Sequence, residues 1–294
     1  MFTQWTPYLW VAQSALYATN HGVFIAGDRA CLIDPGLTRE TLATITAFVA
    51  EREATPHALV ITHGHWDHIL GPEVFANPET NPSLHIVAHA RYLETLKNHG
   101  ENLQQQITNW ETESDIHREH PFVLPRPTLT FTDMLHMRLG DQDLQMLFAP
   151  GHAPDQLVVY HAATGMLWAG DMLSDVEIPM ASGGLVAYED SLARLAELDV
   201  QVLIPGHGAP TADLAEIRTR FAQDRAYLAE LHKRVTHAVQ TGMTREETLT
   251  HCATIARADL ADCAEPHRWN VESAYVELGG APDGDAGWEQ EWQQ

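Results

Sequence analysis

Lysine is scarce in this sequence, and basic residues as a whole are outnumbered by acidic ones. Lys97 and Lys233 are the only lysines among 294 residues, and the formal net charge is -23 because 17 lysines and arginines face 40 aspartates and glutamates. Affinity for nucleic acid is built mainly from lysine and arginine side chains that neutralise phosphates. The sequence therefore predicts a small-molecule substrate and no long nucleic acid as a partner.

Long apolar runs, an export signal and paired cysteines are also lacking. No stretch approaches the roughly 20 apolar residues that a membrane-spanning helix needs, and residues 1–10 carry no basic region ahead of an apolar one. Cys31, Cys252 and Cys263 are an odd number at no metal-ligand spacing, which does not suggest a disulfide framework. We expect a cytoplasmic protein without a membrane partner, and the sequence leaves the oligomeric state open.

Short apolar runs alternate with helical patterns over the first two thirds of the chain. A helix is expected from Thr38 to about Arg52, because Leu42, Ile45 and Val49 recur at helical spacing. The expected strands lie at residues 8–13, 22–26, 30–33, 58–62, 84–88, 128–131, 144–148, 156–160, 166–168 and 201–204. They are too many for a single small sheet, and the alternation is typical of an α/β fold.

Three parts of the chain differ in character. Residues 1–210 are expected to form a catalytic domain, interrupted at 90–127 by a polar, partly helical insertion without strand character. This insertion is a candidate lid, and a pair of surface helices without substrate contact is the equally weighted alternative. Residues 211–280 read as a C-terminal helical module, and residues 281–294 form an acidic tail that is expected to be poorly ordered.

The helical module has recognisable helix starts. Asp213 and Thr244 each have a glutamate three residues further on, and a last helix is expected to open near Pro266. The first of these helices carries an apolar stripe, which must be buried against something. We therefore expect the module to pack against the catalytic domain and to close one wall of the active site.

Histidine, in contrast, is abundant, with 18 copies, and imidazole is the side chain most often used to bind transition metals. The segment His63-Gly64-His65-Trp66-Asp67-His68 follows directly on the expected strand 58–62. Residues two apart in an extended chain point the same way, so His63 and His65 can converge on one ion. Asp67 and His68, past the bend, can face another. A polar loop is the weaker alternative, because imidazole and carboxylate together match zinc-type coordination.

Three further ligand types each follow an expected apolar strand. They are His152, Asp171 and His207, and each stands beside a glycine that lets the backbone turn sharply. Sites in α/β proteins gather beyond the carboxyl ends of strands. Together with the first segment, these residues predict one metal centre.

The ordered set His-x-His-x-Asp-His, Gly-His, Gly-Asp and Pro-Gly-His-Gly resembles the metallo-β-lactamase superfamily over roughly Tyr8 to Pro210. The resemblance implies an αββα sandwich, two packed sheets with helices outside, and two divalent metal ions, with zinc expected first and manganese or iron as alternatives. It implies that one ion is held by His63, His65 and His152, the other by Asp67, His68 and His207, and that Asp171 bridges both. Asp34, in Asp34-Pro35-Gly36, matches a further motif that supports the site through hydrogen bonds.

One departure from the family pattern is informative. Gly151-His152-Ala153-Pro154-Asp155 stands where Gly-His-Thr-Pro-Gly is common. This variant resembles a branch that includes lactamase-like endoribonucleases and a bacterial quinolone-signal effector protein. That branch also carries helices after the last histidine motif, as this chain does.

The resemblance implies hydrolysis by a metal-bridging hydroxide, with Asp67 as the catalytic residue that orients the water and passes on its proton. A small ester, thioester or lactone is the first expected substrate, and phosphodiester hydrolysis on RNA or a nucleotide is the alternative. A metal-binding signalling or regulatory protein with little turnover is a third reading. A β-lactamase is disfavoured, because Asp171 fills a bridging position that those enzymes lack. Other histidines could line the pocket, although structural roles are expected first, namely His21, His117, His120 and His267.

Overall fold

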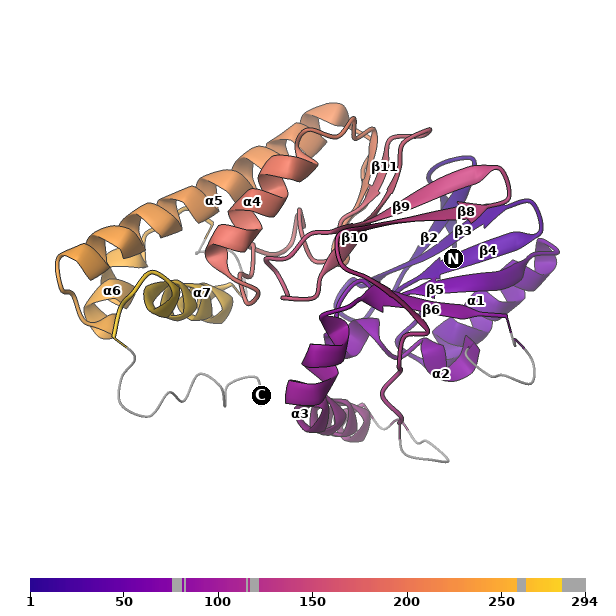
Figure 1. Cartoon of the computed structure of the whole chain (residues 1–294), viewed down its shortest axis with the longest axis horizontal. Coiled ribbons are helices and arrows are strands. Elements are labelled where there is room, and N and C mark those ends of the chain that lie inside the picture. Colours follow the sequence, from indigo (N-terminus) through magenta and orange to yellow (C-terminus); the bar gives the residue numbers. More distant parts are fainter. Residues whose placement is uncertain (76–80, 82, 115, 117–121, 258–262, 282–294) are drawn as a thin grey trace.

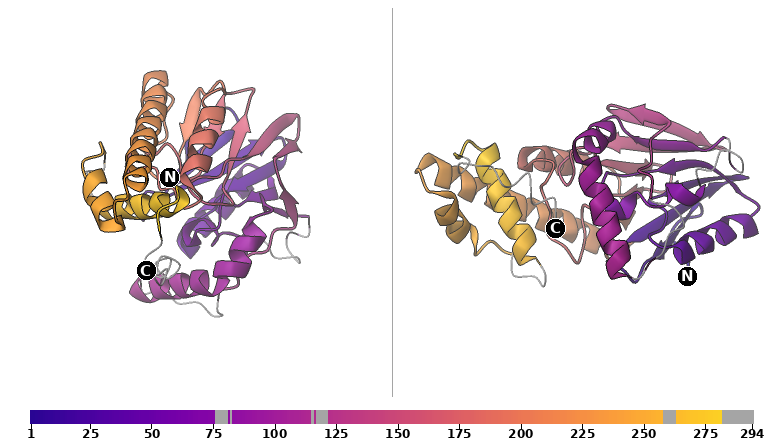
Figure 2. Two further views of the ribbon diagram at one scale, coloured as in Figure 1. Left: turned by 60° about the vertical axis from the view of Figure 1, so that its left-hand side comes forward. Right: turned by 90° about the horizontal axis from the view of Figure 1, so that it is seen from below.

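Two β-sheets packed face to face form the centre of the protein, and helices cover both outer sides (Figures 1 and 2). The computed structural model describes residues 1–75, 81, 83–114, 116, 122–257 and 263–281. The αββα architecture expected from the sequence is confirmed. None of the helices in these described ranges combines the length and the apolarity that crossing a membrane requires.

The first sheet has seven strands in sequence order. They are β1 (Thr3–Gln4), β2 (Leu9–Gln13), β3 (Asn20–Ala26), β4 (Arg29–Ile33), β5 (Thr55–Val60), β6 (His85–His89) and β7 (Leu129–Phe131). Strands β4 to β7 pair in parallel, so their carboxyl ends meet at one edge of the sheet. The connections hold α1 (Arg39–Glu51), a 3₁₀ turn (Trp66–His68), α2 (Pro72–Phe75) and α3 (Tyr92–Glu113).

The second sheet has five strands in the order β12-β11-β10-β9-β8. They are β8 (Met134–Leu139), β9 (Gln142–Phe148), β10 (Leu157–His161), β11 (Met166–Trp168) and β12 (Val202–Ile204). Only β11 and β12 pair in parallel, and the other neighbours are antiparallel. Apolar side chains of both sheets share one buried cluster between them, with Trp168 completely buried at its centre.

Four helices belong to one further buried cluster. They are α4 (Leu185–Leu195), α5 (Leu214–Gln240), α6 (Arg245–Cys252) and α7 (Ala264–Glu277). Helices α4 and α5 lie on the outer side of the second sheet, and α6 and α7 pack against these two helices. Asp213 caps α5 by accepting from the amides of Ala215 and Glu216, and Thr244 and Glu247 form a capping box at α6. The expected helix starts are therefore confirmed.

The C-terminal helices and the sandwich share their core. Leu231 of α5 and Val271 of α7 lie in the same cluster as Tyr188 of α4 and Leu203 of β12. The expectation that these helices pack against the sandwich is confirmed, while a domain boundary at residue 210 stays a prediction. The expected tail 281–294 lies outside the described residues except for Ala281.

All ten expected strands correspond to observed ones, with ends shifted by up to three residues. Strands β1 and β8 and helix α4 were not expected. In β8 the buried Met137 and Leu139 alternate with exposed His136 and Arg138, which is a two-residue period present in the sequence. Helix α4 has Gly184 at its N-cap and no capping side chain of its own, so its start carries no local signal.

The shared core predicts a large difference between two leucines of the same helix. Leu231 is fully buried, whereas Leu214 is 38% exposed. We expect Leu231→Ala to lower the free energy of unfolding by about 2–5 kcal/mol, because a cavity remains where the side chain was. Leu214→Ala should change it by no more than about 0.5 kcal/mol. Urea unfolding at fixed zinc concentration measures both, and equal losses would contradict a core that includes α5.

Candidate metal centre

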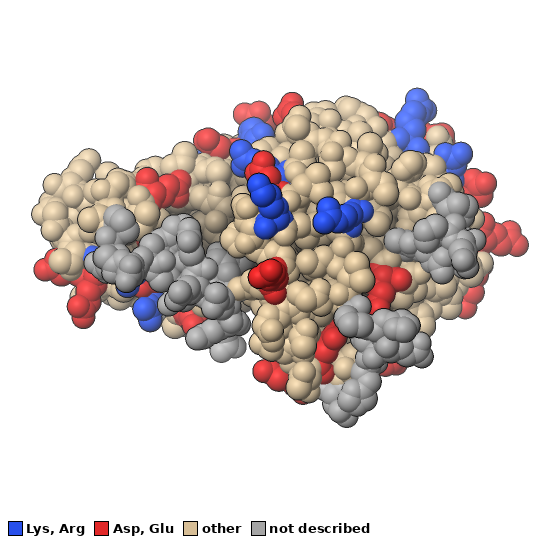
Figure 3. Space-filling view, turned by 60° about the horizontal axis from the view of Figure 1, so that its bottom comes forward, with Lys and Arg blue, Asp and Glu red and all other residues tan. Residues whose placement is uncertain are grey.

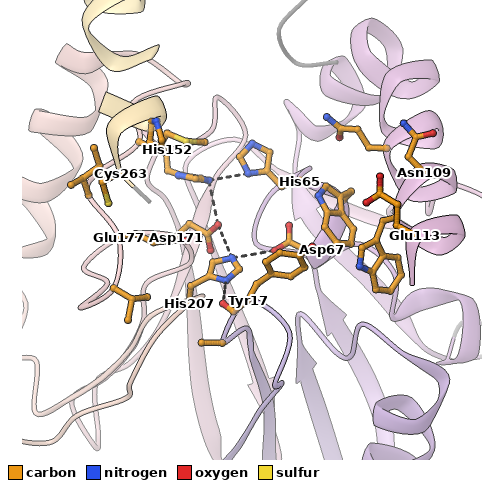
Figure 4. Close-up of a pocket in the computed structure, with 18 residues that line it drawn as sticks. Tyr17, His65, Asp67, Asn109, Glu113, His152, Asp171, Glu177, His207 and Cys263 are labelled. Atoms are coloured by element: carbon orange, nitrogen blue, oxygen red, sulfur yellow. Dashed lines mark hydrogen bonds and ion pairs between the residues drawn. The ribbon is translucent and has the colours of Figure 1, made fainter. Parts of the chain in front are cut away.

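Ligand-type side chains from both sheets converge on one point at the edge of the sandwich (Figure 4). They form two groups, within each of which one ligand atom per residue lies within 4.8 Å of the others. One group contains His63, His65, His152 and Asp171, and the other contains Asp67, His68 and His207. The structure thus brings together all seven residues that the sequence indicated.

Asp171 lies between the two groups. Its Oδ2 is 3.5 Å from Nε2 of His63 and 3.4 Å from Nε2 of His152. On the other side, its Oδ1 is 3.2 Å from Nε2 of His68, and its Oδ2 is 3.3 Å from Nε2 of His207. This position suits a carboxylate that bridges two ions, and that role stays a prediction.

The parallel pairing of β11 and β12 places Asp171 and His207 side by side, because each residue follows the carboxyl end of its strand. The amide of Gly206 donates to the carbonyl of Gly170 over 2.6 Å. A Cβ atom at Gly206 would collide with the Asp171 carboxylate. The close approach of the two ligand segments therefore requires glycine at position 206.

Asp34 supports the second group through buried hydrogen bonds. Its carboxylate accepts from the amide of Thr62 over 2.9 Å and from the hydroxyl of Thr62 over 2.7 Å. Its Oδ2 also lies 3.1 Å from Nδ1 of His68. Since an ionised carboxylate can only accept, Nδ1 of His68 carries a proton, and Nε2 is the ring nitrogen directed at the site. The contact expected from the sequence is present, and its effect on metal binding stays a prediction.

A backbone carbonyl does the same for His207. Nδ1 of His207 lies 2.8 Å from the carbonyl oxygen of Tyr17, which also only accepts, and 3.4 Å from the hydroxyl of Thr19. The proton on Nδ1 leaves Nε2 of His207 free to face the site. The sequence analysis missed this partner, because a backbone carbonyl has no residue-type signature.

The ligand histidines differ in protonation state. Burial lowers the pKa of His152 to about 3 and holds the pKa of His65 well below its usual range. Burial alone would raise the pKa of Asp171, but His68 and His207 outweigh it and hold that pKa well below normal. Burial would lower the pKa of His68 and of His207, but the carboxylates of Asp171 and Asp67 outweigh it and hold both pKa values well above normal. Both rings are therefore protonated while no cation lies between them, and a bound metal ion would replace those protons.

The arrangement of nitrogens also fits a bound cation. Nε2 of His63 is buried and makes no hydrogen bond with any described residue. Nε2 of His68 and Nε2 of His207 face each other over 3.3 Å, and the Nδ1 atoms of both rings point to other acceptors. Two facing lone pairs repel unless a proton or a cation lies with them. Imidazole and carboxylate together suit a divalent transition-metal ion such as zinc.

A cavity of about 960 Å³ opens over the ligands, within the size range of small-molecule sites. Tyr17, Trp66 and Trp110 form an aromatic part of its lining, with ring centroids 5.7 Å apart for Tyr17 and Trp66 and 5.0 Å apart for Trp66 and Trp110. Figure 4 shows Asn109 and Glu113 of α3 on one side of the ligands, and Glu177 and Cys263 on the opposite side. Helix α3, within the insertion 90–127, thus lines the cavity, while its role as a lid and its contact with substrate stay predictions.

The segment that follows Asp171 forms another wall, and Glu177 is the lining residue that the sequence analysis missed there. Burial raises the pKa of Glu177 to about 7. Arg257, just beyond α6, donates to the Glu177 carbonyl over 2.8 Å and to Oδ1 of Asp224 in α5 over 2.7 Å. Cys263 and Pro266 also line the cavity, so the expected wall from the C-terminal helices is present.

The other histidines considered as pocket residues have different surroundings. Nδ1 of His21 lies 2.8 Å from the Asp34 carbonyl, and the ring is fully buried within β3. Nδ1 of His267 lies 2.8 Å from the Tyr227 hydroxyl between α5 and α7. Both make structural contacts, and neither lines the cavity over the ligands. His117 and His120 lie outside the described residues.

The buried Asp34 contacts predict that this carboxylate tunes metal affinity. Asp34→Asn keeps the size of the side chain but removes the charge that holds the His68 proton, and we expect zinc affinity to fall about 10 to 100-fold. Asp28→Asn makes the same change on the exposed turn between β3 and β4 and should leave affinity unaltered. Competition titration with a zinc chelator measures both variants. Equal zinc affinities of the two variants would show that the Asp34 carboxylate does not contribute to metal binding.

Comparison with known proteins agrees with this geometry. The family model of the metallo-beta-lactamase superfamily matches residues 16–207. The probable metallo-hydrolase YqjP of Bacillus subtilis is 27% identical over an alignment of 233 positions, which covers 68% of this chain and 71% of that protein. A human acyl-coenzyme A thioesterase is 24% identical over 200 residues, covering 60% of this chain and 68% of the thioesterase.

Among solved structures, the sec-alkylsulfatase Pisa1 of Pseudomonas sp. superposes with a TM-score of 0.74 at 18% identity. The match covers 97% of this chain but only about half, 51%, of the sulfatase, and at this identity it shows the fold alone. The branch suggested by Ala153-Pro154-Asp155 stays a prediction. With the family model matched over most of the sandwich and its ligand positions gathered at one edge, the chain belongs to the metallo-beta-lactamase superfamily of metal-dependent hydrolases.

Proposed function

We propose that this protein is a binuclear hydrolase that cleaves a small ester, thioester or lactone. The observation that carries the proposal is Asp171, whose carboxylate lies between two groups of ligand side chains at the floor of an open cavity. We propose zinc as the metal, with manganese or iron as alternatives. When bound, two such ions supply hydroxide from water near neutral pH and polarise the bond to be broken.

Asp67 is the residue proposed to handle the proton. Its Oδ2 lies 3.1 Å from Nε2 of His207, and its side chain also lines the cavity. Burial would raise the pKa of Asp67, but the neighbouring His68 and His207 lower it well below its usual value. The carboxylate is therefore ionised and can accept a hydrogen bond from the attacking water.

The cavity lining favours a substrate with little negative charge. Among its described lining residues there is no lysine or arginine, whereas the carboxyl groups of Glu113 and Glu177 line it beside the ligands. On the face in Figure 3, lysines and arginines stand in small separate groups among larger uncharged areas. A phosphodiester is expected to bind less well, because the described lining offers no lysine or arginine to neutralise its negative charge. The thioesterase name of one relative also supports acyl-bond hydrolysis.

The two ligand groups predict two metal equivalents per chain. Elemental analysis of protein prepared without chelator, or reconstituted with zinc, should approach that value. Asp171→Ala should lower the metal content and remove nearly all hydrolysis, because the carboxylate contacts histidines of both groups. Full activity of that variant would show that the shared carboxylate is dispensable, and a content near zero in the parent protein would overturn the site itself.

The substrate class is tested by a hydrolysis screen of the zinc-loaded protein. We expect turnover of p-nitrophenyl butyrate, a thioester or a lactone, and none of bis-p-nitrophenyl phosphate. On the best substrate, Asp67→Asn should lower kcat about 10² to 10⁴-fold because the proton acceptor is lost. Glu113→Gln removes a cavity carboxylate outside both ligand groups and should leave kcat within about threefold, as for a group that takes no part in proton transfer.

Metal content is measured on both variants, so that loss of an ion is distinguished from loss of the proton acceptor. Preference for the phosphodiester would favour the nuclease alternative. The absence of turnover on every class, with both ions bound, would favour a regulatory protein.

A further inference from the structure

A second cavity of about 570 Å³ adjoins the metal site. It shares five lining residues with the first cavity, namely His65, Trp66, Asp67, Gln106 and Met180. From these residues it continues along the segment 180–184 to α6 and α7, where Trp269 and Val276 line it. The second cavity is therefore a groove that begins at the metal ligands and ends on the C-terminal helices.

Three polar side chains along this groove are already engaged within the protein. Asn270 accepts from the Ala181 amide over 2.7 Å and donates to the Pro179 carbonyl over 2.7 Å. Glu277 accepts from the amides of Leu185 and Val186 at the start of α4, over 2.7 and 3.2 Å.

Glu272 is the third of these side chains, and it pairs with two arginines. Its Oε1 lies 3.1 Å from Nε of Arg268 and 3.9 Å from Nε of Arg245. These polar groups therefore hold the walls of the groove together and have little left to offer a ligand.

The remaining lining is largely apolar. Trp66 and Met180 stand where the groove leaves the metal site, and Trp269 and Val276 stand further along it, each of the four partly buried. A partly buried apolar surface gains free energy when a ligand removes it from water. The backbone of Gly183 and Gly184 adds lining without any side chain that a ligand would have to displace.

We propose that this groove holds the apolar chain, acyl or alkyl, of the molecule that is cleaved at the metal centre. The assignment rests on the proposed hydrolase function, since the shared residues put one end of the groove at the reacting atoms. The protein then prefers esters with a chain of several carbons over short ones. Each methylene that leaves water raises affinity by up to about fourfold.

The test measures binding separately from turnover. Butyrate and decanoate are titrated calorimetrically into the full-length, zinc-loaded protein, and we expect decanoate to bind at least about tenfold more tightly, because six more methylenes reach the groove. Val276→Trp narrows the groove and Trp269→Ala removes part of its wall, so both should reduce that ratio. Val74→Trp makes the matched change on exposed α2, outside both cavities, and should preserve the ratio.

The outcomes separate the groove from the hydrolase assignment. Equal affinities for the two fatty acids, or a ratio that both groove variants leave unchanged, would overturn the proposed groove. If the preference for decanoate over butyrate falls in the groove variants but neither p-nitrophenyl butyrate nor p-nitrophenyl decanoate is hydrolysed, the groove is supported and ester hydrolysis is contradicted. Hydrolysis with equal kcat/KM for the two esters would support the hydrolase and contradict the groove. Thermal unfolding of each variant checks that the fold is intact.

Discussion

The site depends on one buried carboxylate. The oxygens of Asp171 lie between 3.2 and 3.5 Å from imidazole nitrogens of four histidines, two that follow β5 in the first sheet and two from the second sheet. A buried carboxylate needs positive charge close by, because water no longer solvates it. Histidine protons or metal ions can supply that charge, and the outward-facing Nδ1 contacts of His68 and His207 favour ions between the rings. The contacts that neutralise Asp171 therefore also connect the two sheets at this edge, in addition to the apolar cluster between them.

The C-terminal helices are part of this arrangement because they hold the segment that follows Asp171. Arg257 binds the carbonyl of Glu177, and Asn270 binds both Pro179 and Ala181. The strain of this segment is visible in Leu173, whose φ of 61° is unusual for a residue with a branched side chain. Such a backbone persists only when surrounding contacts determine it. The helices thus fix one wall of the cavity, in addition to the packing of α5 against the second sheet.

Much of the fold and of the ligand set could be predicted from the sequence, for physical reasons. The strands are apolar runs bounded by turn residues, and each ligand follows the carboxyl end of a strand. This position in the sequence was enough to predict that His63, His152, Asp171 and His207 meet at one edge. The partners that arise from distant backbone could not be predicted in this way. Glu277 accepts a hydrogen bond from the first amide of α4, although it lies 92 positions further along the sequence. The Tyr17 carbonyl and the His207 ring that it contacts are 190 positions apart. Neither contact leaves a trace in local spacing.

The carbonyl of Tyr17 separates two kinds of change in the loop between β2 and β3. A substitution at position 17 by a residue that tolerates its φ of 57° changes the aromatic lining of the cavity, whereas the backbone carbonyl that contacts His207 is retained. Inserting or deleting one residue in this loop would instead turn that carbonyl away, since Gly208 donates to the adjacent Ala18 carbonyl and fixes the register. The side chain at position 17 can therefore change, and with it the surface that the cavity offers to a substrate, while the backbone contact that orients His207 is kept. A change in loop length would remove that contact.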